Sequence, residues 1–340
     1  MPDSVSVVDV ARRAGVSLGT VSNVLNRPER VTPAIRGRVL VAIEELGFVR
    51  NEAARQLRAG RSRAIGLVVL DFGNPFFTDL AAGAESAAAE AGLSVVLCNS
   101  ANSQDRERHH LNLLQQQRSY GILITPVAGK TSRIDEIRRT GTAAVLVDRA
   151  SGRRRCSVSV DDVVGGCVAV AHLLQGGHRR IAFVGGPMSL NQVSERLRGA
   201  RQAFGDVGVP LQGLVELETA AMTVAEGRHA GERIAELAAE ERPTAVFCAN
   251  DLLALGLLQE MTRRRIGVPG ELAIVGYDDI EFAAAAAVPL TSVRQPRAQL
   301  GHAATNLLID EVENPLAHSH RQIVFEPELV VRLSSEPPRA

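Results

Sequence analysis

Residues 17–26 read SLGTVSNVLN, and this stretch has the pattern of a short helix with one apolar and one polar face. Ser17 is a residue type that caps helix N-termini, and Val21, Val24 and Leu25 follow at spacings of i, i+3 and i+4. A helix this short is marginal on its own in water. It therefore needs neighbouring helices that cover the apolar stripe and leave the polar face open to a partner.

The flanking residues predict those neighbours. Ser6 followed by Asp9 is a capping-box pattern, and Gly15 ends the helix it starts. Thr32 and Pro33 begin a third helix. The apolar positions expected to face inward are Val7, Val8, Ala11, Ala14, Ile35, Val39, Ala42, Ile43 and Leu46, and Gly47 closes the third helix. Helix, glycine turn, helix and supporting helix is the order of a helix-turn-helix domain, expected over residues 1–50, whose second helix enters a DNA major groove.

The polar face of residues 17–26 carries hydroxyl and amide groups, which suit phosphate oxygens and base edges. The residues predicted to face DNA are Ser17, Leu18, Gly19, Thr20, Ser22, Asn23 and Asn26. Leu18 can contact a thymine methyl group, and Gly19 allows close backbone approach. Asn23 suits a bidentate contact to adenine, although a solvated surface amide is an equally good interpretation of this residue alone.

Charge is unevenly distributed along the chain. The first 63 residues carry eleven arginines and six acidic residues, a balance of +5, whereas the whole chain has no net charge. A basic N-terminal part favours a polyanionic partner. An ordinary fluctuation of surface charge is the alternative.

Residues 51–63, NEAARQLRAGRSR, are helix-prone but polar, and Leu57 is their one large apolar side chain. Arg55 and Arg58 flank it. Leu57 is therefore a candidate wedge between base pairs of the minor groove, with the arginines on phosphates. The predicted DNA contacts of this hinge segment are Asn51, Arg55, Leu57 and Arg58. A flexible basic linker is the alternative interpretation.

From residue 64 onward, short apolar runs alternate with segments of helical length. The runs at 64–70, 93–98, 121–125 and 143–147 predict one parallel sheet, and those at 180–186, 244–250 and 271–277 predict a second. The fold class expected is an all-α head followed by an α/β core of two doubly wound lobes. The chain is expected to cross between the lobes near 157–162 and 289–296. The first lobe would hold about 64–160 plus 294–318, and the second about 161–291 plus 320–335, within a core of 64–340.

Polar residues follow the predicted strands, at the sheet edge where ligands of such folds bind. They are Asp71, Asn74, Asp148, Arg149, Asn250, Asp251, Tyr277 and Asp278. Carboxylates, amides and a guanidinium together suit a ligand rich in hydroxyl groups, which needs both donors and acceptors. Phe76 and Phe77 are suited to cover the apolar face of a sugar ring, or else to pack a helix onto the sheet. Asn250 and Asp278 are also residue types of ordinary strand-end turns.

The two stretches VVDVARRAGVSLGTVSNVLN and VTPAIRGRVLVAIEELGFVRNEAARQLRAGRS resemble the DNA-binding head and hinge of the LacI/GalR family of bacterial transcription regulators. The motifs NPFF, VDR, SERLRG, AND and GYDD resemble the ribose-type version of the sugar-binding core. The resemblance implies that Leu18, Gly19 and Asn23 read operator bases and that Leu57 of each subunit enters the central base step.

The same resemblance implies an effector site. Its residues would be Asn74, Phe76, Phe77, Asp148, Arg149, Arg196, Asn250 and Asp278, with Arg294 nearby and Met222 where relatives often carry an aromatic ring. The protein expected is a cytoplasmic repressor that binds a pseudo-palindromic operator as a homodimer and responds to a sugar, such as a pentose, or a related polyol. A soluble sugar receptor without a role on DNA and a regulator dependent on a purine corepressor are the alternatives.

Other classes find little support. No G-x-G-x-x-G follows a predicted strand, and AGKTS at 128–132 lacks the first glycine of a phosphate loop, so no enzyme and no cofactor are expected. The four cysteines are Cys98, Cys156, Cys167 and Cys248, without a C-x-x-C pair, and are interpreted as buried thiols. The pairs His109–His110 and His318/His320 are interpreted as solvated surface histidines, with no metal expected. Neither export nor membrane insertion is predicted.

Overall fold

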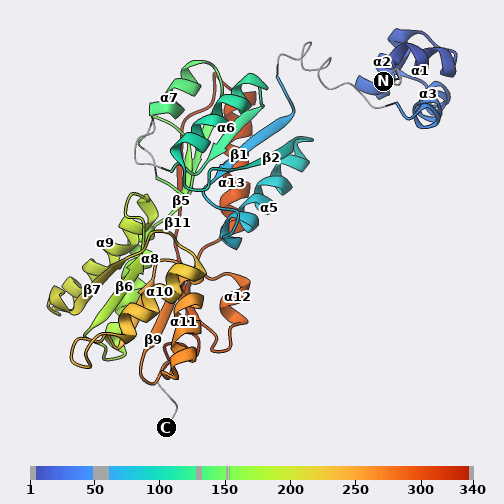
Figure 1. Cartoon of the computed structure of the whole chain (residues 1–340). Coiled ribbons are helices and arrows are strands. Elements are labelled where there is room, and N and C mark those ends of the chain that lie inside the picture. Colours follow the sequence, from blue (N-terminus) through green and yellow to red (C-terminus); the bar gives the residue numbers. More distant parts are fainter. Residues whose placement is uncertain (1–4, 49–60, 128–131, 151, 153, 337–340) are drawn as a thin grey trace. The chain divides into compact units, whose positions relative to one another are not determined.

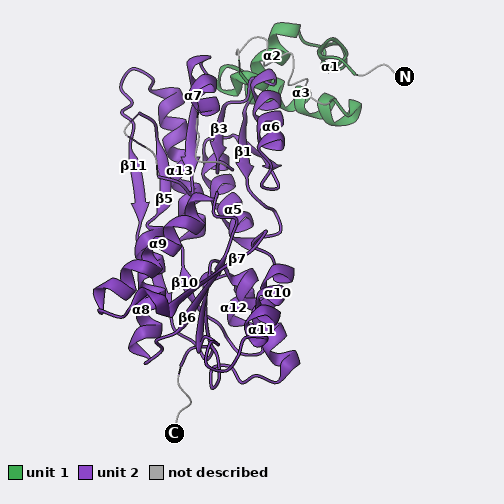
Figure 2. Cartoon of the chain, turned by 60° about the vertical axis from the view of Figure 1, so that its left-hand side comes forward, with its two compact units in different colours: residues 1–62 green, residues 63–340 purple. Residues whose placement is uncertain are grey.

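The computed structural model describes residues 5–48, 61–127, 132–150, 152 and 154–336. The chain divides into two compact units, residues 1–62 and residues 63–340 (Figure 2). The first unit is the predicted helical head and the second is the predicted α/β core. Each unit is described by itself.

The described residues of the head form three helices and a short 3-10 turn. Helix α1 spans Val7–Ala14, α2 spans Leu18–Asn26, the turn η1 spans Pro28–Arg30, and α3 spans Pro33–Leu46. The capping box at Ser6 is present: the Ser6 side chain accepts the backbone N–H of Asp9, and the Asp9 side chain accepts the backbone N–H of Ser6. Gly15 and Gly47 end α1 and α3 at φ values of 62° and 60°, a left-handed conformation that favours glycine. The predicted order of elements in the head is therefore confirmed.

The core of the head is small and made of short side chains. Its buried members are Val10, Ala11, Ala14, Val21, Val24, Val39 and Ala42. One inward position was predicted wrongly, because Val8 is 48% exposed and Val10 is buried in its place. Each helical residue turns the side chain by about 100°, so positions 7, 10, 11 and 14 share a face and position 8 does not.

The second unit contains two sheets of the same size. The first sheet has the order β11-β5-β4-β3-β1-β2 and the second has the order β12-β10-β9-β8-β6-β7. In the first sheet β1 spans Ala64–Val69, β2 Ser94–Asn99, β3 Gly121–Ile124, β4 Ala144–Val147, β5 Ser157–Val160 and β11 Gln322–Phe325. In the second β6 spans Ile181–Gly185, β7 Leu214–Glu218, β8 Ala245–Cys248, β9 Ala273–Asp278, β10 Thr291–Arg294 and β12 Glu328–Val330.

Helices cover both faces of each sheet, and each sheet with its helices forms one lobe (Figure 1). Those of the first lobe are α5 (Pro75–Glu90), α6 (Gln104–Gln116), α7 (Ser132–Arg139) and α13 (Arg297–Glu313). Those of the second lobe are α8 (Asp162–Gln175), α9 (Asn191–Asp206), α10 (Val224–Ala235), α11 (Asp251–Arg264) and α12 (Glu281–Ala284). The central strands are buried on both faces, as continuous apolar runs require. The two predicted doubly wound lobes are thus confirmed.

The chain crosses between the lobes after β5, after β10 and after β11, and the third crossing lies later than the predicted position near 318–320. β11 pairs in parallel with β5 of the first sheet, and β12 pairs antiparallel with β10 of the second. The first lobe therefore extends to Phe325, not to residue 318, and the last segment of the second lobe starts at Glu328, not at 320. β10 belongs to the second lobe, so that lobe also includes 291–294.

The edge strands β7, β11 and β12 were not predicted, because their sequences alternate polar and apolar residues. Within the described residues, no helix is both long and apolar enough to cross a membrane.

Candidate functional site

The exposed face of α2 in the head is the candidate DNA-binding surface. Part of its polar set is engaged within the helix: the Ser17 hydroxyl accepts the Thr20 backbone N–H at 3.1 Å, and Asn26 Nδ2 donates to the Ser22 carbonyl at 2.8 Å. Ser17 is therefore the helix cap as well as a surface residue. These bonds fix the start and end of α2 and so the positions of the residues between them.

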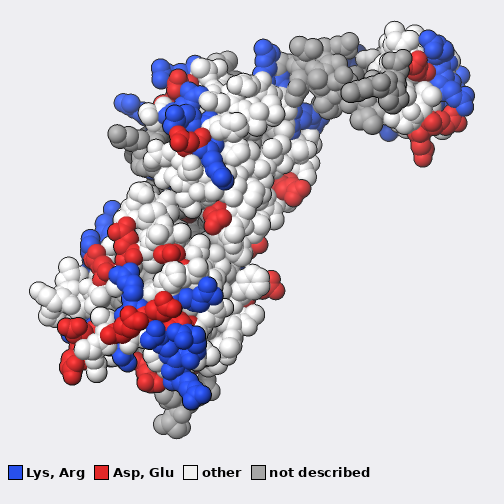
Figure 3. Space-filling view, in the orientation of Figure 1, with Lys and Arg blue, Asp and Glu red and all other residues white. Residues whose placement is uncertain are grey.

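Leu18, Gly19 and Asn23 are the exposed remainder of this surface. Leu18 is 51% exposed, as much as Val8 and Val41 of the same head, and it lies on the side predicted to face DNA. Basic side chains gather along one side of the head unit (Figure 3). The predicted hinge contacts Asn51, Arg55, Leu57 and Arg58 lie outside the described residues.

In the core, the first polar group between the lobes is Asn74, which precedes α5. Its Oδ1 accepts the Phe76 backbone N–H at 3.0 Å and so caps the helix. Its Nδ2 donates to Asp278 Oδ2 at 3.0 Å, and Asp278 is the last residue of β9 in the other lobe. Both side chains are buried. Asn74 therefore joins the carboxyl edges of the two sheets.

Arg196 of α9 is the buried cation of this region. Its Nε donates to Asp162 Oδ1 at 2.8 Å, and its Nη1 donates to the Ala249 carbonyl at 2.7 Å and lies 3.9 Å from Asp278 Oδ1. The guanidinium lies 3.6 Å above the centre of the Tyr277 ring, a cation–π contact. The side chain is 3% exposed, so one arginine is held rigidly among carboxylates and an aromatic ring.

Asp148, which follows β4, is the carboxylate that the first lobe contributes. Its backbone is left-handed, with φ of 56°. Gln192 Nε2 of the second lobe donates to Asp148 Oδ2 at 3.1 Å. The other oxygen, Oδ1, is buried and has no hydrogen-bond partner among the described residues. A buried carboxylate oxygen without a partner is costly and is well suited to accept a bond from a ligand.

We call Asn74, Asp148, Arg196 and Asp278 the interlobe cluster. Burial is the main reason that the pKa of Asp148 lies well above its usual value, and Asp162 raises it further while Arg196 opposes. Burial likewise raises the pKa of Asp278, and Arg196 and Asn74 oppose this. For Arg196, burial lowers the pKa, but the surrounding carboxylates outweigh it and the pKa ends above the ordinary value. The cluster thus holds one permanent cation and carboxylates that resist full ionisation.

Asn250 and Met222 lie together in the second lobe. The Asn250 side chain caps α11 by accepting the Leu253 N–H at 3.0 Å, and its Nδ2 donates to the Met222 carbonyl at 3.2 Å. Both the oxygen and the nitrogen of the Asn250 side-chain amide therefore have structural partners, as the interpretation of Asn250 as a turn residue expects. Phe76 and Phe77 pack edge to face with ring centres 5.0 Å apart and are both buried in the core of the first lobe.

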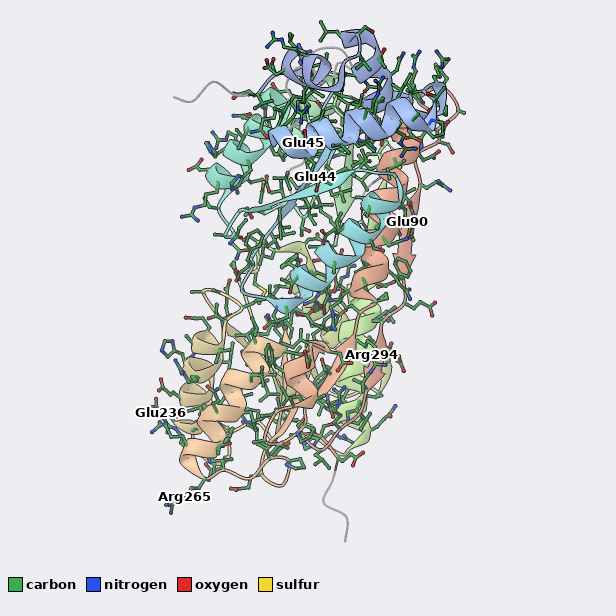
Figure 4. All side chains as sticks on the ribbon, turned by 90° about the vertical axis from the view of Figure 1, so that its right-hand side faces the viewer. Glu44, Glu45, Glu90, Glu236, Arg265 and Arg294 are labelled. Carbon is green, nitrogen blue, oxygen red and sulfur yellow. The ribbon has the colours of Figure 1, made fainter. Side chains whose placement is uncertain are left out.

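Two further predicted residues are Arg149 and Arg294. Arg149 is half-buried; burial lowers its pKa, while Glu195 and Glu107 act in the opposite direction. Arg294 is exposed near the passage between the lobes (Figure 4) and pairs with Asp279 at 2.8 Å and Glu328 at 3.4 Å. It lines a pocket of about 330 Å³ together with Asp79, Gln295 and other residues.

Three partners of the interlobe cluster were not predicted: Asp162, Gln192 and Gln295. Gln295 Nε2 donates to Asp278 Oδ1 at 2.7 Å. Gln192 precedes Arg196 by four residues, so the spacing alone places both on one face of α9. Asp162 stands at the first position of a helix, where an aspartate is usually interpreted as a dipole partner, and this concealed its role as the counter-ion of Arg196.

Comparison with known proteins agrees with this arrangement. Residues 6–51 match the model of bacterial regulatory proteins of the lacI family, and residues 170–335 match a periplasmic binding protein-like domain. The HTH-type transcriptional repressor PurR of Vibrio parahaemolyticus is 32% identical over 336 residues, covering 96% of this chain and 97% of that protein.

Solved structures agree as well. The lac repressor dimer bound to operator and the anti-inducer ONPF is 26% identical, with a TM-score of 0.84 over 98% of this chain and 99% of that one. A LacI family regulator from Enterococcus faecium with bound ribose is 27% identical, with a TM-score of 0.74 over 81% of this chain and 100% of that one.

The head and the bilobed core together define a DNA-binding transcription regulator with an effector-binding core, and not an enzyme. The chain belongs to the LacI family of bacterial regulators. This excludes the alternative of a soluble receptor with no role on DNA.

Proposed function

We propose that this regulator is a cytoplasmic repressor that binds a pseudo-palindromic operator as a homodimer and takes a sugar, such as a pentose, or a related polyol between its lobes. The interlobe cluster is the observation that carries the proposal. Two carboxylates, an amide and a rigid arginine meet there from both lobes, and hydroxyl groups need such a mixture of acceptors and donors.

The fit to a hydroxyl-rich ligand is specific. Asp148 Oδ1 is buried without a partner among the described residues, and its Oδ2 has only a glutamine amide. A ligand hydroxyl can donate to Oδ1, while neighbouring hydroxyls accept from Arg196 and replace the Asn74–Asp278 bond. Such a ligand would touch both lobes and stabilise one degree of closure over another. Differential affinity of this kind is all that control of operator affinity requires.

A purine corepressor is the second candidate, because the PurR proteins of Vibrio are similar over nearly the whole chain. A planar base is generally bound by stacking on an aromatic ring. Phe76, Phe77 and Tyr277 are buried within the lobes, whereas Phe72, two residues before Asn74, is 40% exposed and is the ring that a purine could use for stacking. The mixed donors and acceptors of the interlobe cluster favour the sugar over the purine.

Thermal unfolding with a panel of ligands tests the effector class. We expect one or more members of a set of ribose, xylose, glucose, ribitol and cellobiose to raise the melting temperature, and hypoxanthine and guanine to leave it unchanged. Asp278→Asn should abolish the shift, and Asp206→Asn, an exposed position on the second lobe, should keep it. A shift with the purines alone would replace the sugar by the second candidate, and no shift with either class would refute the effector proposal.

Operator binding tests the head. We expect the intact protein to select a two-fold symmetric duplex from a randomised pool, with an affinity that falls as salt rises. Leu18→Ala should weaken that binding about tenfold, within the range of about 1–3 kcal/mol that loss of recognition at one base pair typically costs. Val41→Ala is the matched control, since Val41 is 53% exposed on α3 of the same head. Leu57→Ala should weaken specific binding without changing effector affinity. Equal losses for Leu18→Ala and Val41→Ala would refute the assignment of α2.

A further inference from the structure

A mixed cluster of thiol, imidazole and carboxylate groups lies in the first lobe, apart from the interlobe cluster. Its members are Cys156, Glu311, His318 and His320, and one potential ligand atom of each lies within 4.8 Å of the others. Cys156 directly precedes β5, Glu311 belongs to α13, and the two histidines lie in the connection from α13 to β11. Three separate chain segments therefore meet at the amino edge of the sheet.

The interpretation of His318 as a solvated surface residue was wrong. Its side chain is 3% exposed, and its Nε2 lies 3.2 Å from Cys156 Sγ. The neighbouring ring of His320 has its Nδ1 3.8 Å from the same sulfur. No spacing pattern reveals this, because Cys156 lies more than 150 residues earlier in the chain.

These separations suit a tetrahedral ion. Zinc–sulfur bonds of about 2.3 Å and zinc–nitrogen bonds of about 2.0 Å at tetrahedral angles place a sulfur about 3.5 Å from a nitrogen. The two observed separations, 3.2 Å and 3.8 Å, lie on either side of that value. One thiolate, two imidazoles and one carboxylate are also a ligand set that zinc accepts.

The surroundings of the four side chains are those of a metal site. His318 Nδ1 lies 2.7 Å from Asp310 Oδ2, an arrangement that leaves Nε2 pointing at the sulfur. Carboxylates commonly orient metal-binding histidines in this way. The Arg321 backbone N–H donates to Cys156 Sγ at 3.4 Å. Glu311 Oε2 is buried and has no partner among the described residues.

One neighbour opposes a cation. Arg138 Nη2 donates to Glu311 Oε1 at 2.9 Å and lies 2.8 Å from His320 Nε2. Without an ion, the guanidinium supplies the positive charge that Glu311 requires. With an ion, His320 would bind through Nδ1 and the guanidinium would have to move away from Nε2. Arg138 thus competes with the metal.

We propose that Cys156, His318, His320 and Glu311 bind one Zn²⁺ and thereby fix the connection between α13 and β11. Cys156 gives up its thiol proton to solvent when it binds.

Titration of the metal-free full-length protein with Zn²⁺ tests the proposal by calorimetry, and Co²⁺ serves as a spectroscopic probe. We expect one site per chain, a higher melting temperature with Zn²⁺, and a thiolate-to-cobalt charge-transfer band. Cys156→Ser should remove that band and weaken Zn²⁺ binding at least 100-fold. Cys167→Ser, a cysteine beside Asp206 in the second lobe, is the matched control and should bind like wild type.

Two further variants test the Zn²⁺ site even if Cys156→Ser fails to fold. Asp310→Asn should weaken Zn²⁺ binding about tenfold, as expected for a group that orients a ligand. Arg138→Met should tighten binding, which loss of structure cannot do. Absence of saturable binding in wild type, a cobalt thiolate band that persists in Cys156→Ser, or weaker binding in Arg138→Met would each refute the site.

Discussion

The two lobes have the same strand order but contribute differently to the region between them. In the second lobe, Arg196 is held by Asp162, the Ala249 carbonyl and the Tyr277 ring, all of the same lobe. In the first lobe, Asn74 and Asp148 direct their side chains to Asp278 and Gln192 of the other lobe. Separation of the lobes therefore breaks the Asn74–Asp278 and Gln192–Asp148 hydrogen bonds between them. It leaves the arginine network within the second lobe intact.

This difference implies a division of labour. The second lobe offers a preorganised set of donors and acceptors, because the conformational entropy of these side chains is already lost when the lobe folds. The first lobe offers groups that must exchange one partner for another when the lobes move. The following changes test that division, from the largest expected effect to the smallest.

Arg196→Met should have the largest effect on stability. It leaves Asp162 and Asp278 buried without their cation, and removal of one partner from a buried ion network costs about 3–5 kcal/mol. Chemical denaturation of the core measures this loss. Arg198→Met is the control on the same helix, because Arg198 is 65% exposed and its pair with Glu195 is 3.7 Å long. Similar losses for both variants would show that the network is not preorganised in the way described.

Asn74→Ala should cost about 1 kcal/mol through loss of a helix cap, and it should also remove the bond between the lobes. Ser103→Ala is the matched control, since Ser103 caps α6 of the same lobe by accepting the Arg106 N–H. Ser103→Ala should lose only the free energy of a helix cap, and Asn74→Ala should lose more, because it also leaves the buried Asp278 Oδ2 without that donor. Only Asn74→Ala should change the effector-dependent shift in melting temperature and the lobe spacing measured by small-angle scattering. An unchanged effector response would remove Asn74 from the site.

Asp148→Asn should stabilise the protein without effector slightly, raising the melting temperature by about 2 °C, and should abolish effector binding. Burial, followed by Asp162, raises the pKa of Asp148 above 3.8 in the folded state. The folded protein therefore holds this proton more tightly than the unfolded chain, and stability from this group falls as pH rises from about 4 through the raised pKa. Melting temperatures measured between pH 4 and pH 8 should decline less in the variant. A steeper decline in the variant would contradict the sign.

Local patterns in the sequence predicted much of the fold. Ser6 with Asp9, Gly15 and Gly47 mark helix ends through bonds to residues three or four positions away. The helices of the head could therefore be predicted from local sequence alone. The apolar runs of the central strands are equally local. Strands β11 and β12 are short and half exposed, and their membership in a sheet depends on β5 and β10 far along the chain. No local pattern carries that information.

The candidate sites show the same limit. Asn74, Asp148 and Asp278 follow strands, and the topology of parallel sheets brings such positions to one edge. Gln192 and Asp162 lie on helices, and only tertiary packing brings their side chains to the residues at this edge. The approach of His318 to Cys156 depends on the course of the α13–β11 connection, which the sequence does not specify in advance.

The repeated crossing between lobes has a consequence for synthesis of the protein. The first sheet is completed by β11 at Gln322–Phe325, and the second by β12 at Glu328–Val330. On the ribosome, neither lobe can close its sheet until nearly all of the chain has been translated, whereas the head is available to fold after some fifty residues. Nascent chains should therefore expose the β5 edge from its synthesis at Ser157–Val160 until β11 is made, and the β10 edge only from Thr291–Arg294 until β12 is made. A chaperone that shields such edges would act on the core and not on the head.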